Sequence, residues 1–452
     1  MSKSIVFSVF IARILLYMPF ITIAGCIPVL IEEWQISATQ ASSIVSAFNF
    51  AYAFSLLGFS WISDHIGAKR SVSISAWATA LACVAFAFYA EDFASTLILY
   101  SLISLCQGGV YTPLIVLFRE NTPARKLGTV IGWLIASTSI GFAASIGLTG
   151  LSIGLSGWRL AFLITGLPPV VGSVILLLAI KSIPNVVHLR VPGSGLWQEL
   201  RKNDSAKRLL AGYTSHNWEL HGMWAWAPAL IAASFVLTGE TTVVATELSA
   251  HFIMLLHLFG AVAAYTMGQL SDRFGRRTIL IWVAAIAAGF SFSVGWFVAF
   301  TPYLIASLVI VYSFFALGDS PVLTTSIAER VEPAFLGAIF AVRSLSGFVA
   351  GAISPVVVGV VIDVLRAEQF SDTLIWGLAF STLGFGGTSP TIVANTEEYD
   401  ANYTTTGSFG KLSGGFLFGD ASNISSSLYE GTNIVSGSPQ IAVDVSGSFD
   451  EG

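Results

Sequence analysis

Residues 268–277 read GQLSDRFGRR, and residues 60–70 read SWISDHIGAKR. Each stretch is a short polar turn between two long apolar runs, and the two turns lie 208 residues apart. A second pair of similar stretches, residues 123–128 and 333–337, has almost the same offset, because both contain Pro-Ala followed by Leu-Gly. Two repeats that share one offset indicate an internally duplicated chain.

The composition of the chain is that of a membrane protein. Apolar residues of the set AVILMFWYC make up 54% of it and charged residues 10%, against roughly 25% charged residues in soluble domains. A helix of ~20 apolar residues crosses a bilayer core of ~30 Å. The first run is too long for a signal peptide, so we expect it to remain as a helix. The predicted spans are 4–31, 39–62, 71–90, 94–118, 128–153, 158–181, 213–237, 247–268, 278–300, 303–326 and 336–361, with a twelfth from Thr373.

The two polar turns resemble the signature loop of the major facilitator superfamily of transporters. That loop has the pattern Gly-x-Leu-Ala/Ser-Asp-Arg-x-Gly-Arg-Lys/Arg. The second copy matches it throughout, whereas the first departs from it at Ser60, Ile62, His65 and Ala68. The resemblance implies two six-helix bundles that transport by alternating access. It also implies loops that pair with neighbouring helix ends and hold the outward-facing state, although their basic residues also direct topology. The gating residues are then Asp64, Gly67, Lys69, Arg70, Gly268, Asp272, Arg273, Gly275, Arg276 and Arg277.

The predicted spans divide the chain into four parts. Residues 1–181 form an N-terminal six-helix bundle, 182–212 a cytoplasmic linker, 213–387 a C-terminal bundle and 388–452 a polar, acidic tail. The linker contains leucines interspersed with basic residues, which is typical of an amphipathic helix on the membrane surface. A solvated linker is the alternative.

The twelfth span loses its apolar character abruptly. Its apolar part, residues 374–387, reaches only ~21 Å as a helix, so the last helix is expected to be truncated. The polar sequence that follows favours a disordered tail. The change inside a helix also suggests a doubtful origin for the tail, either a reading-frame change or a joined foreign sequence.

The basic residues of the loops predict the orientation. They lie almost entirely on one side of this topology, so the positive-inside rule places the N-terminus in the cytoplasm. We therefore expect an integral protein of the plasma (inner) membrane. The net charge of −5 indicates no nucleic-acid partner, and Cys26, Cys83 and Cys106 have no metal-ligand spacing. These cysteines are interpreted as packing residues, and neither a metal nor another cofactor is expected.

Charged residues inside the spans are the candidates for function, because each is costly in a membrane. Arg13, Glu219, Asp319 and Arg343 all lie ~9–14 Å from the cytoplasmic boundary if each residue rises ~1.5 Å. Asp319 and Arg343, on consecutive helices, are predicted to form an ion pair. These four charged residues at similar depth either have a structural role, in which they hold the helices in register, or form a binding and gating network.

Three further residues complete the candidate substrate and coupling site. His216 and Trp226 share a helical face with Glu219, in a span rich in aromatic residues, which is typical of an aromatic-lined cavity. His257 lies near the middle of its span, where an imidazole can relay a proton. A hydrogen-bonded packing histidine is an equally good interpretation.

We therefore predict a secondary transporter of a small organic solute. An arginine in each half favours an organic anion, and proton coupling is a further possibility. The antiporter Gly-Pro core is absent from residues 139–147, which counts against drug export. A drug or metabolite exporter of the same fold is one alternative, and a non-transporting membrane sensor or scaffold is another. No helix has a nucleophile with its base or a His-Glu-x-x-His pair, so an enzyme is not expected. The expected partners are the lipid bilayer, the solute and protons.

Overall fold

A computed structural model describes residues 3–122, 124–187, 200–331 and 336–396. Every regular element in these residues is a helix, as predicted for an all-α membrane protein. Ten of the described helices are long and apolar enough to cross a membrane. Of the predicted tail, residues 388–396 belong to the last described helix, whereas residues 397–452 lie outside the described part of the chain.

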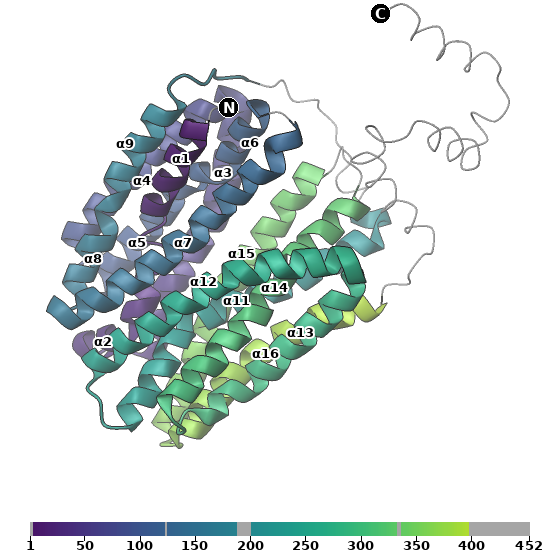
Figure 1. Ribbon diagram of the computed structural model, residues 1–452. Helices are drawn as coiled ribbons and strands as arrows, with labels where there is room; N and C mark the ends of the chain where they lie inside the picture. The colour runs from purple at the N-terminus through teal and green to yellow at the C-terminus, as the bar shows by residue number, and fades with distance from the viewer. Residues whose placement is uncertain (1–2, 123, 188–199, 332–335, 397–452) are drawn as a thin grey trace, which may run out of the picture. The chain divides into compact units, whose positions relative to one another are not determined.

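The helices before the linker gather on one side of the structure (Figure 1). Three predicted spans of this half are interrupted: the sixth is divided into α8 and α9, and the breaks in the first and fourth are described below. The elements are α1 (Lys3–Leu16), α2 (Thr22–Trp34), α3 (Ala38–Ile66), α4 (Ala68–Tyr89), α5 (Phe93–Gln107), η1 (Gly108–Val110), α6 (Thr112–Glu120), α7 (Ala124–Ser156), α8 (Trp158–Gly166) and α9 (Pro168–Ile180).

The helices after the linker form the second half. Their elements are α11 (Asp204–Leu237), α12 (Thr242–Phe274), α13 (Arg276–Ser293), η2 (Val294–Phe297), α14 (Pro302–Arg330), α15 (Leu336–Ala367) and α16 (Asp372–Thr396). Helix α11 begins inside the predicted linker. Its Leu209 and Leu210 are buried against α13 and α14, in a cluster with Leu280, Val322 and Ile327. For these two leucines, burial in the protein replaces the predicted contact with the membrane surface.

Helix α16 continues beyond the apolar run that ends at Gly387. It reaches Thr396 and has 25 residues, which is long enough to span the core at ~1.5 Å per residue. The change in composition at Gly387 therefore does not end the helix.

The duplication is also visible in the backbone of the two polar turns. Gly67 separates α3 from α4 with φ +90°, and Gly275 separates α12 from α13 with φ +91°. Residues with a side chain rarely adopt this conformation, so both turns require glycine. The backbone N–H of each glycine donates to the carbonyl four residues earlier, that of Ser63 and Ser271 respectively.

The first and fourth predicted spans are broken, and side chains satisfy the freed backbone groups. Between α1 and α2, the hydroxyl of Tyr100 lies 2.8 Å from the Pro19 carbonyl and 2.6 Å from that of Phe20. The Gln107 amide donates to the Leu16 carbonyl over 2.7 Å. In the fourth span the break is η1, between α5 and α6. Irregular backbone at membrane depth is tolerated where protein buries it.

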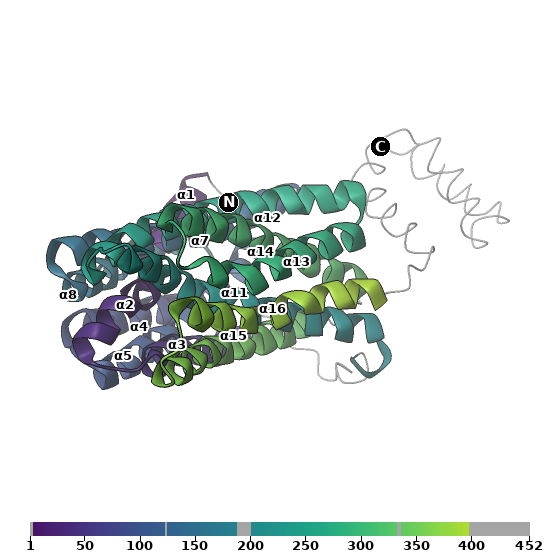
Figure 2. The same cartoon turned by 90° about the horizontal axis from the view of Figure 1, so that it is seen from below.

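The two halves meet through α3 with α15 and α7 with α12; Figure 2 shows α3 beside α15. On α7 and α12, a Cβ at Gly150 would lie 2.5 Å from the Cβ of Ala250. On α3 and α15, Asn49 donates to the carbonyl of Gly351 over 3.2 Å. The Gly150 contact lies in the part of α7 and α12 remote from the polar turns, so the halves touch at that end, whereas the Asn49 contact lies near the middle of α3 and α15.

Candidate substrate and coupling site

Arg13 is a buried cation that is held entirely by neutral groups. Its side chain on α1 is 1% exposed. Its Nε donates to Ser137 Oγ over 3.0 Å, Nη2 donates to Thr138 Oγ1 over 2.8 Å and Nη1 donates to the Val110 carbonyl. The Val110 carbonyl belongs to the break in the fourth span. Within the described residues no carboxylate forms an ion pair with Arg13.

Tyrosine rings flank the Arg13 guanidinium on two sides. Its centre lies 4.9 Å from the ring centroid of Tyr17 and 5.8 Å from that of Tyr111. Both distances allow cation–π attraction. Of the five N–H donors that a guanidinium carries, three make the hydrogen bonds given above. Arg13 is therefore fixed in place and retains donors for a further acceptor.

The predicted ion pair between Asp319 and Arg343 is wrong. Arg343 on α15 donates to Thr324 Oγ1 on α14 over 2.8 Å, and its guanidinium lies 4.2 Å from the ring centroid of Tyr213. Thr324 is five residues from Asp319 on α14, towards the polar turns, so Arg343 contacts α14 nearer to those turns than the carboxylate. The predicted equal depth of Asp319 and Arg343 therefore did not identify the partner of either residue.

Asp319 pairs instead with His216. Its Oδ1 lies 2.7 Å from Nδ1 of His216 on α11, and both side chains are buried. The two atoms are within ion-pair distance, although neither meets hydrogen-bond geometry. The contact joins α11 to α14 inside the C-terminal half. A neutral histidine would leave the Asp319 charge uncompensated, which is costly in a buried site.

Glu219 lies three residues further along α11 and faces two hydroxyl groups. Its Oε1 accepts from Ser291 Oγ over 2.5 Å and from the hydroxyl of Tyr312 over 2.9 Å. The Glu219 side chain is 1% exposed. In the part of the chain that the structure describes, no cation forms an ion pair with it. Glu219 and Asp319 therefore both lie between helices of the C-terminal half. Neither of these carboxylates pairs with Arg13 or Arg343.

Trp226 has a structural role in this half. Its Nε1 donates to the carbonyl of Pro355 over 2.9 Å, and its ring packs edge-on against Trp376. The prediction that Trp226 lines a cavity does not agree with these contacts, because they join α11 to α15 and α16.

Aromatic groups of several helices meet between the halves, and of these the sequence analysis named only His257 as a site residue. Trp224 and His257 both lie within 5.7 Å of the Phe142 ring on α7, measured between ring centroids. Tyr52 on α3 is 5.0 Å from Phe348 on α15 by the same measure. His257 thus takes part in ring contacts between the halves, and the described residues give its nitrogens no hydrogen bond.

A small cavity lies between the halves at the same level. It is lined from the first half by Asn49 and Tyr100 and from the second by His221 and Trp224, and its volume is about 20 Å³. This is room for about one water molecule. Helical spacing could have indicated these lining residues from the sequence, because His221 and Trp224 are three residues apart and share a helical face with Asn217.

The first polar turn is tied to the end of α9. The Nζ atom of Lys69 donates to the carbonyls of Lys181 and Ile183, each over 2.6 Å. The side chain of Asn185 accepts from the backbone N–H of Arg70 over 3.2 Å. A cation at the C-terminal end of a helix is favourable. Asp64 is half-buried in the last turn of α3.

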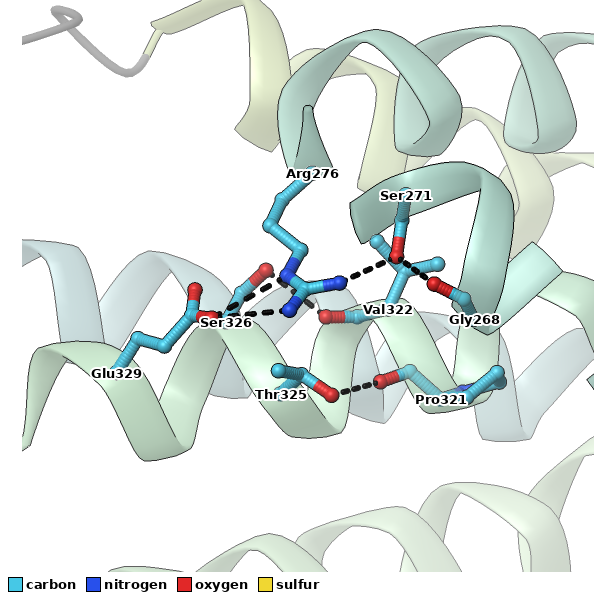
Figure 3. Close-up of polar contacts among 8 residues, drawn as sticks. All are labelled: Gly268, Ser271, Arg276, Pro321, Val322, Thr325, Ser326 and Glu329. Atoms are coloured by element: carbon cyan, nitrogen blue, oxygen red, sulfur yellow. Dashed lines mark hydrogen bonds and ion pairs between the residues drawn. The ribbon is translucent and has the colours of Figure 1, made fainter. Parts of the chain in front are cut away.

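The second polar turn is tied to the end of α14 (Figure 3). Arg276 donates through Nη2 to Glu329 Oε1 over 3.0 Å and through Nη1 to Ser271 Oγ over 2.6 Å. Ser271 in turn donates to the Gly268 carbonyl over 2.8 Å. Arg273 is exposed and lies over the ring of Phe274. Arg277 is the second residue of α13, whereas the side chain of Asp272 lies outside the described residues.

Two duplicated helical halves, joined at one end and enclosing buried charges, define an integral membrane transporter. The chain belongs to the Major Facilitator Superfamily, whose family model matches residues 9–355. It is thus a transporter of small solutes rather than an enzyme.

Comparison with known proteins supports this membership. The chain is 23% identical over 395 residues to the hexuronate transporter of Bacillus subtilis, covering 83% of this chain and 91% of that protein. It is 22% identical over 387 residues to the niacin transporter NiaP of Acinetobacter baylyi, and this match covers 84% of this chain and 76% of that protein. The fold is shared with a solved structure of a bacterial homolog to the human lysosomal transporter Spinster, in an inward-facing and unoccupied conformation. The TM-score is 0.71 at 14% sequence identity, and the match covers 87% of this chain and 96% of that chain.

Proposed function

We propose that this transporter carries a small organic anion and that Arg13 is its anchor. The observation that supports this is a cation 1% exposed whose hydrogen-bond partners among the described residues are a carbonyl and two hydroxyls. A buried charge is stable only when it is paired and hydrogen-bonded. An anionic solute would supply the missing counter-charge and accept from the remaining guanidinium N–H groups.

Arg343 supports the same choice of substrate. It is the second arginine inside the spans, it comes from the other half, and Tyr213 and Thr324 are its neutral neighbours. Hexuronate, which the relative from Bacillus subtilis transports according to its name, is an organic anion. An anion that contacts Arg13 in one half and Arg343 in the other would couple binding to movement of the halves.

Proton coupling is the second part of the proposal, and Glu219 is its site. Hydroxyl groups alone donate to this buried carboxyl among the described residues. Binding a proton there removes a charge that has no cation beside it. His216 and Asp319, one turn away on the same α11–α14 interface, form a neighbouring pair that a proton can also reach.

The proposed setting is the plasma (inner) membrane, with the N-terminus and the polar turns in the cytoplasm. The basic residues Lys69, Arg70, Arg276 and Arg277 support this orientation, because cytoplasmic loops carry an excess of lysine and arginine. We also propose the two halves, residues 1–181 and 213–387, as the bundles that rock against each other.

The test is uptake of labelled organic anions into proteoliposomes that contain the purified protein. A thermal-shift screen of organic acids first identifies a ligand, because binding to the folded state raises the melting temperature. We expect Arg13→Gln to lower uptake at least about tenfold, since a charge-assisted hydrogen bond contributes ~1.5–3 kcal/mol. Arg13→Lys keeps the charge but loses the planar fork, so we expect partial activity.

The matched control is Arg159→Gln, because Arg159 is an exposed arginine that lies over the ring of Trp158. Wild-type uptake by a folded Arg13→Gln protein would contradict the anion anchor. Binding of neutral or cationic drugs with outward transport would instead support the exporter alternative.

A further inference from the structure

One carboxylate crosses between the halves at the end remote from the polar turns. Asp363 lies near the end of α15, in the second half of the chain. Its Oδ1 accepts from the backbone N–H of Ala38 over 2.9 Å, and its Oδ2 accepts from that of Thr39 over 2.8 Å. Ala38 and Thr39 are the first residues of α3, in the other half. The carboxylate thus faces the positive end of the α3 dipole.

Helix α3 satisfies its other terminal donors by itself. Ser37 and Gln40 form a capping box, in which the Ser37 side chain accepts from the Gln40 N–H and the Gln40 side chain accepts from the Ser37 N–H. The first turn of a helix has four N–H groups without an intrahelical partner. The capping box leaves those of Ala38 and Thr39, and Asp363 accepts from both. All four N–H groups at the N-terminus of α3 therefore have acceptors only while the two halves are in contact.

A glycine one helical turn before Asp363 allows α15 and α3 to pack closely at this contact. Gly359 lies four residues before Asp363 and hence on the same face of α15. A Cβ at Gly359 would lie 2.6 Å from Ser42 Oγ and 2.9 Å from the Ala38 carbonyl. Only a residue without a side chain allows α15 to approach α3 closely enough for the Asp363 carboxylate to reach the helix terminus.

We propose that Asp363 is a latch that holds the two halves together at this end, and that it must open in each transport cycle. Alternating access requires the halves to separate there so that solute enters from that side. Separation breaks both hydrogen bonds and removes the carboxylate from the helix dipole. The latch therefore favours the state that is closed at this end, whatever solute Arg13 binds.

The test is a distance measurement between spin labels on the full-length chain. Labels at Glu33 and Glu368, which are exposed and lie on opposite halves near the latch, are attached after replacing Cys26, Cys83 and Cys106 by alanine. For Asp363→Ala we expect the ratio of long to short distances to rise about tenfold, which corresponds to ~1.4 kcal/mol. Asp363→Asn keeps one acceptor and should give a smaller rise.

Two further variants make the result specific. Ala38→Pro removes one of the two N–H donors from the other half, and proline is tolerated at the first position of a helix; it should shift the distances in the same direction as Asp363→Ala. Asp92→Ala is the matched control, because Asp92 caps its own helix α5 through the Ser95 N–H. Unchanged distances in folded Asp363→Ala and Ala38→Pro would overturn the latch, as would an equal shift in Asp92→Ala.

Discussion

At the scale of single residues, the sequence pointed to buried charges but did not give their partners: Arg13, Glu219 and Asp319 are each 1% exposed. Their positions within apolar spans singled these residues out, because a charge inside a span is costly. The partner of each depends on side-chain length and on which helix faces which. Asp319 consequently lies beside His216 rather than Arg343, although Asp319 and Arg343 are on consecutive helices.

The first prediction at this scale concerns Glu219→Gln. An amide keeps hydrogen bonds with the Ser291 and Tyr312 hydroxyls but cannot bind and release a proton. We expect accumulation driven by an imposed pH gradient to fall at least about tenfold, whereas exchange of solute without a gradient continues at a similar rate. Both rates are measured in the same proteoliposomes.

The control for this prediction is Glu240→Gln, because Glu240 is an exposed acid in the loop after α11. If Glu219→Gln accumulates solute as well as the wild type under the same gradient, then Glu219 does not carry the coupling proton. Equal loss of gradient-driven uptake and exchange would identify a structural role instead.

At the scale of helices, the duplication extends to residues that fold differently in the two halves. Pro19 and Pro228 differ by 209 positions, and Pro113 and Pro321 by 208. The first member of each pair lies at a helix break, whereas Pro228 and Pro321 lie inside the continuous helices α11 and α14. In the first half, Tyr100 and Gln107 satisfy the carbonyls that the break frees. Proline alone does not determine a break.

The prediction at this scale concerns Gly150 on α7, where the halves touch. A Cβ there would lie 2.5 Å from that of Ala250 on α12. We therefore expect Gly150→Val to lower the free energy of unfolding by ~1–3 kcal/mol through overpacking and to favour separation of the halves at this end. Thermal unfolding in detergent and the spin-label distances described above measure the two effects.

The matched control is Gly289→Val on α13, because a Cβ at Gly289 meets no atom within 4 Å. A Gly150→Val protein with the stability and the distances of Gly289→Val would show that α7 and α12 are not in close contact at this point.

At the scale of the whole molecule, the latch and the polar turns lie at opposite ends of the two halves. Asp363 joins one half to the other, whereas Lys69 and Arg276 bind helix ends within their own halves. The described contacts therefore keep each half rigid at the polar-turn end while the latch joins the halves at the other. This difference is what a rocking motion requires.

The prediction at this scale compares Arg276→Ala with Arg273→Ala. Arg276 contacts Glu329 and Ser271, whereas Arg273 is exposed over Phe274. An exposed ion pair contributes ~0.2–1 kcal/mol, so we expect Arg276→Ala to slow transport by about two- to fivefold and Arg273→Ala to change it less. Initial rates of uptake at equal protein content measure both, and the opposite order would contradict a role of the Arg276 contact in cycling.

The sequence by itself determined the class of this protein and its internal duplication. Apolar runs of membrane length have few alternatives to helices, because backbone groups in lipid must be satisfied within the segment. The repeated turns at 60–70 and 268–277 then identified the family, and the glycines at their centres follow from the positive φ that each turn needs.

Only the tertiary structure decided which residues face one another. The helical pattern of α11 contains both the face of Glu219 and the face of His221, and nothing local distinguishes the one that packs inside its own half from the one between the halves. The Asp363 contact spans 325 residues of sequence to Ala38, and it exists because α15 approaches α3 closely at Gly359. Such partners depend on how complete helices pack, which local propensity and spacing do not encode.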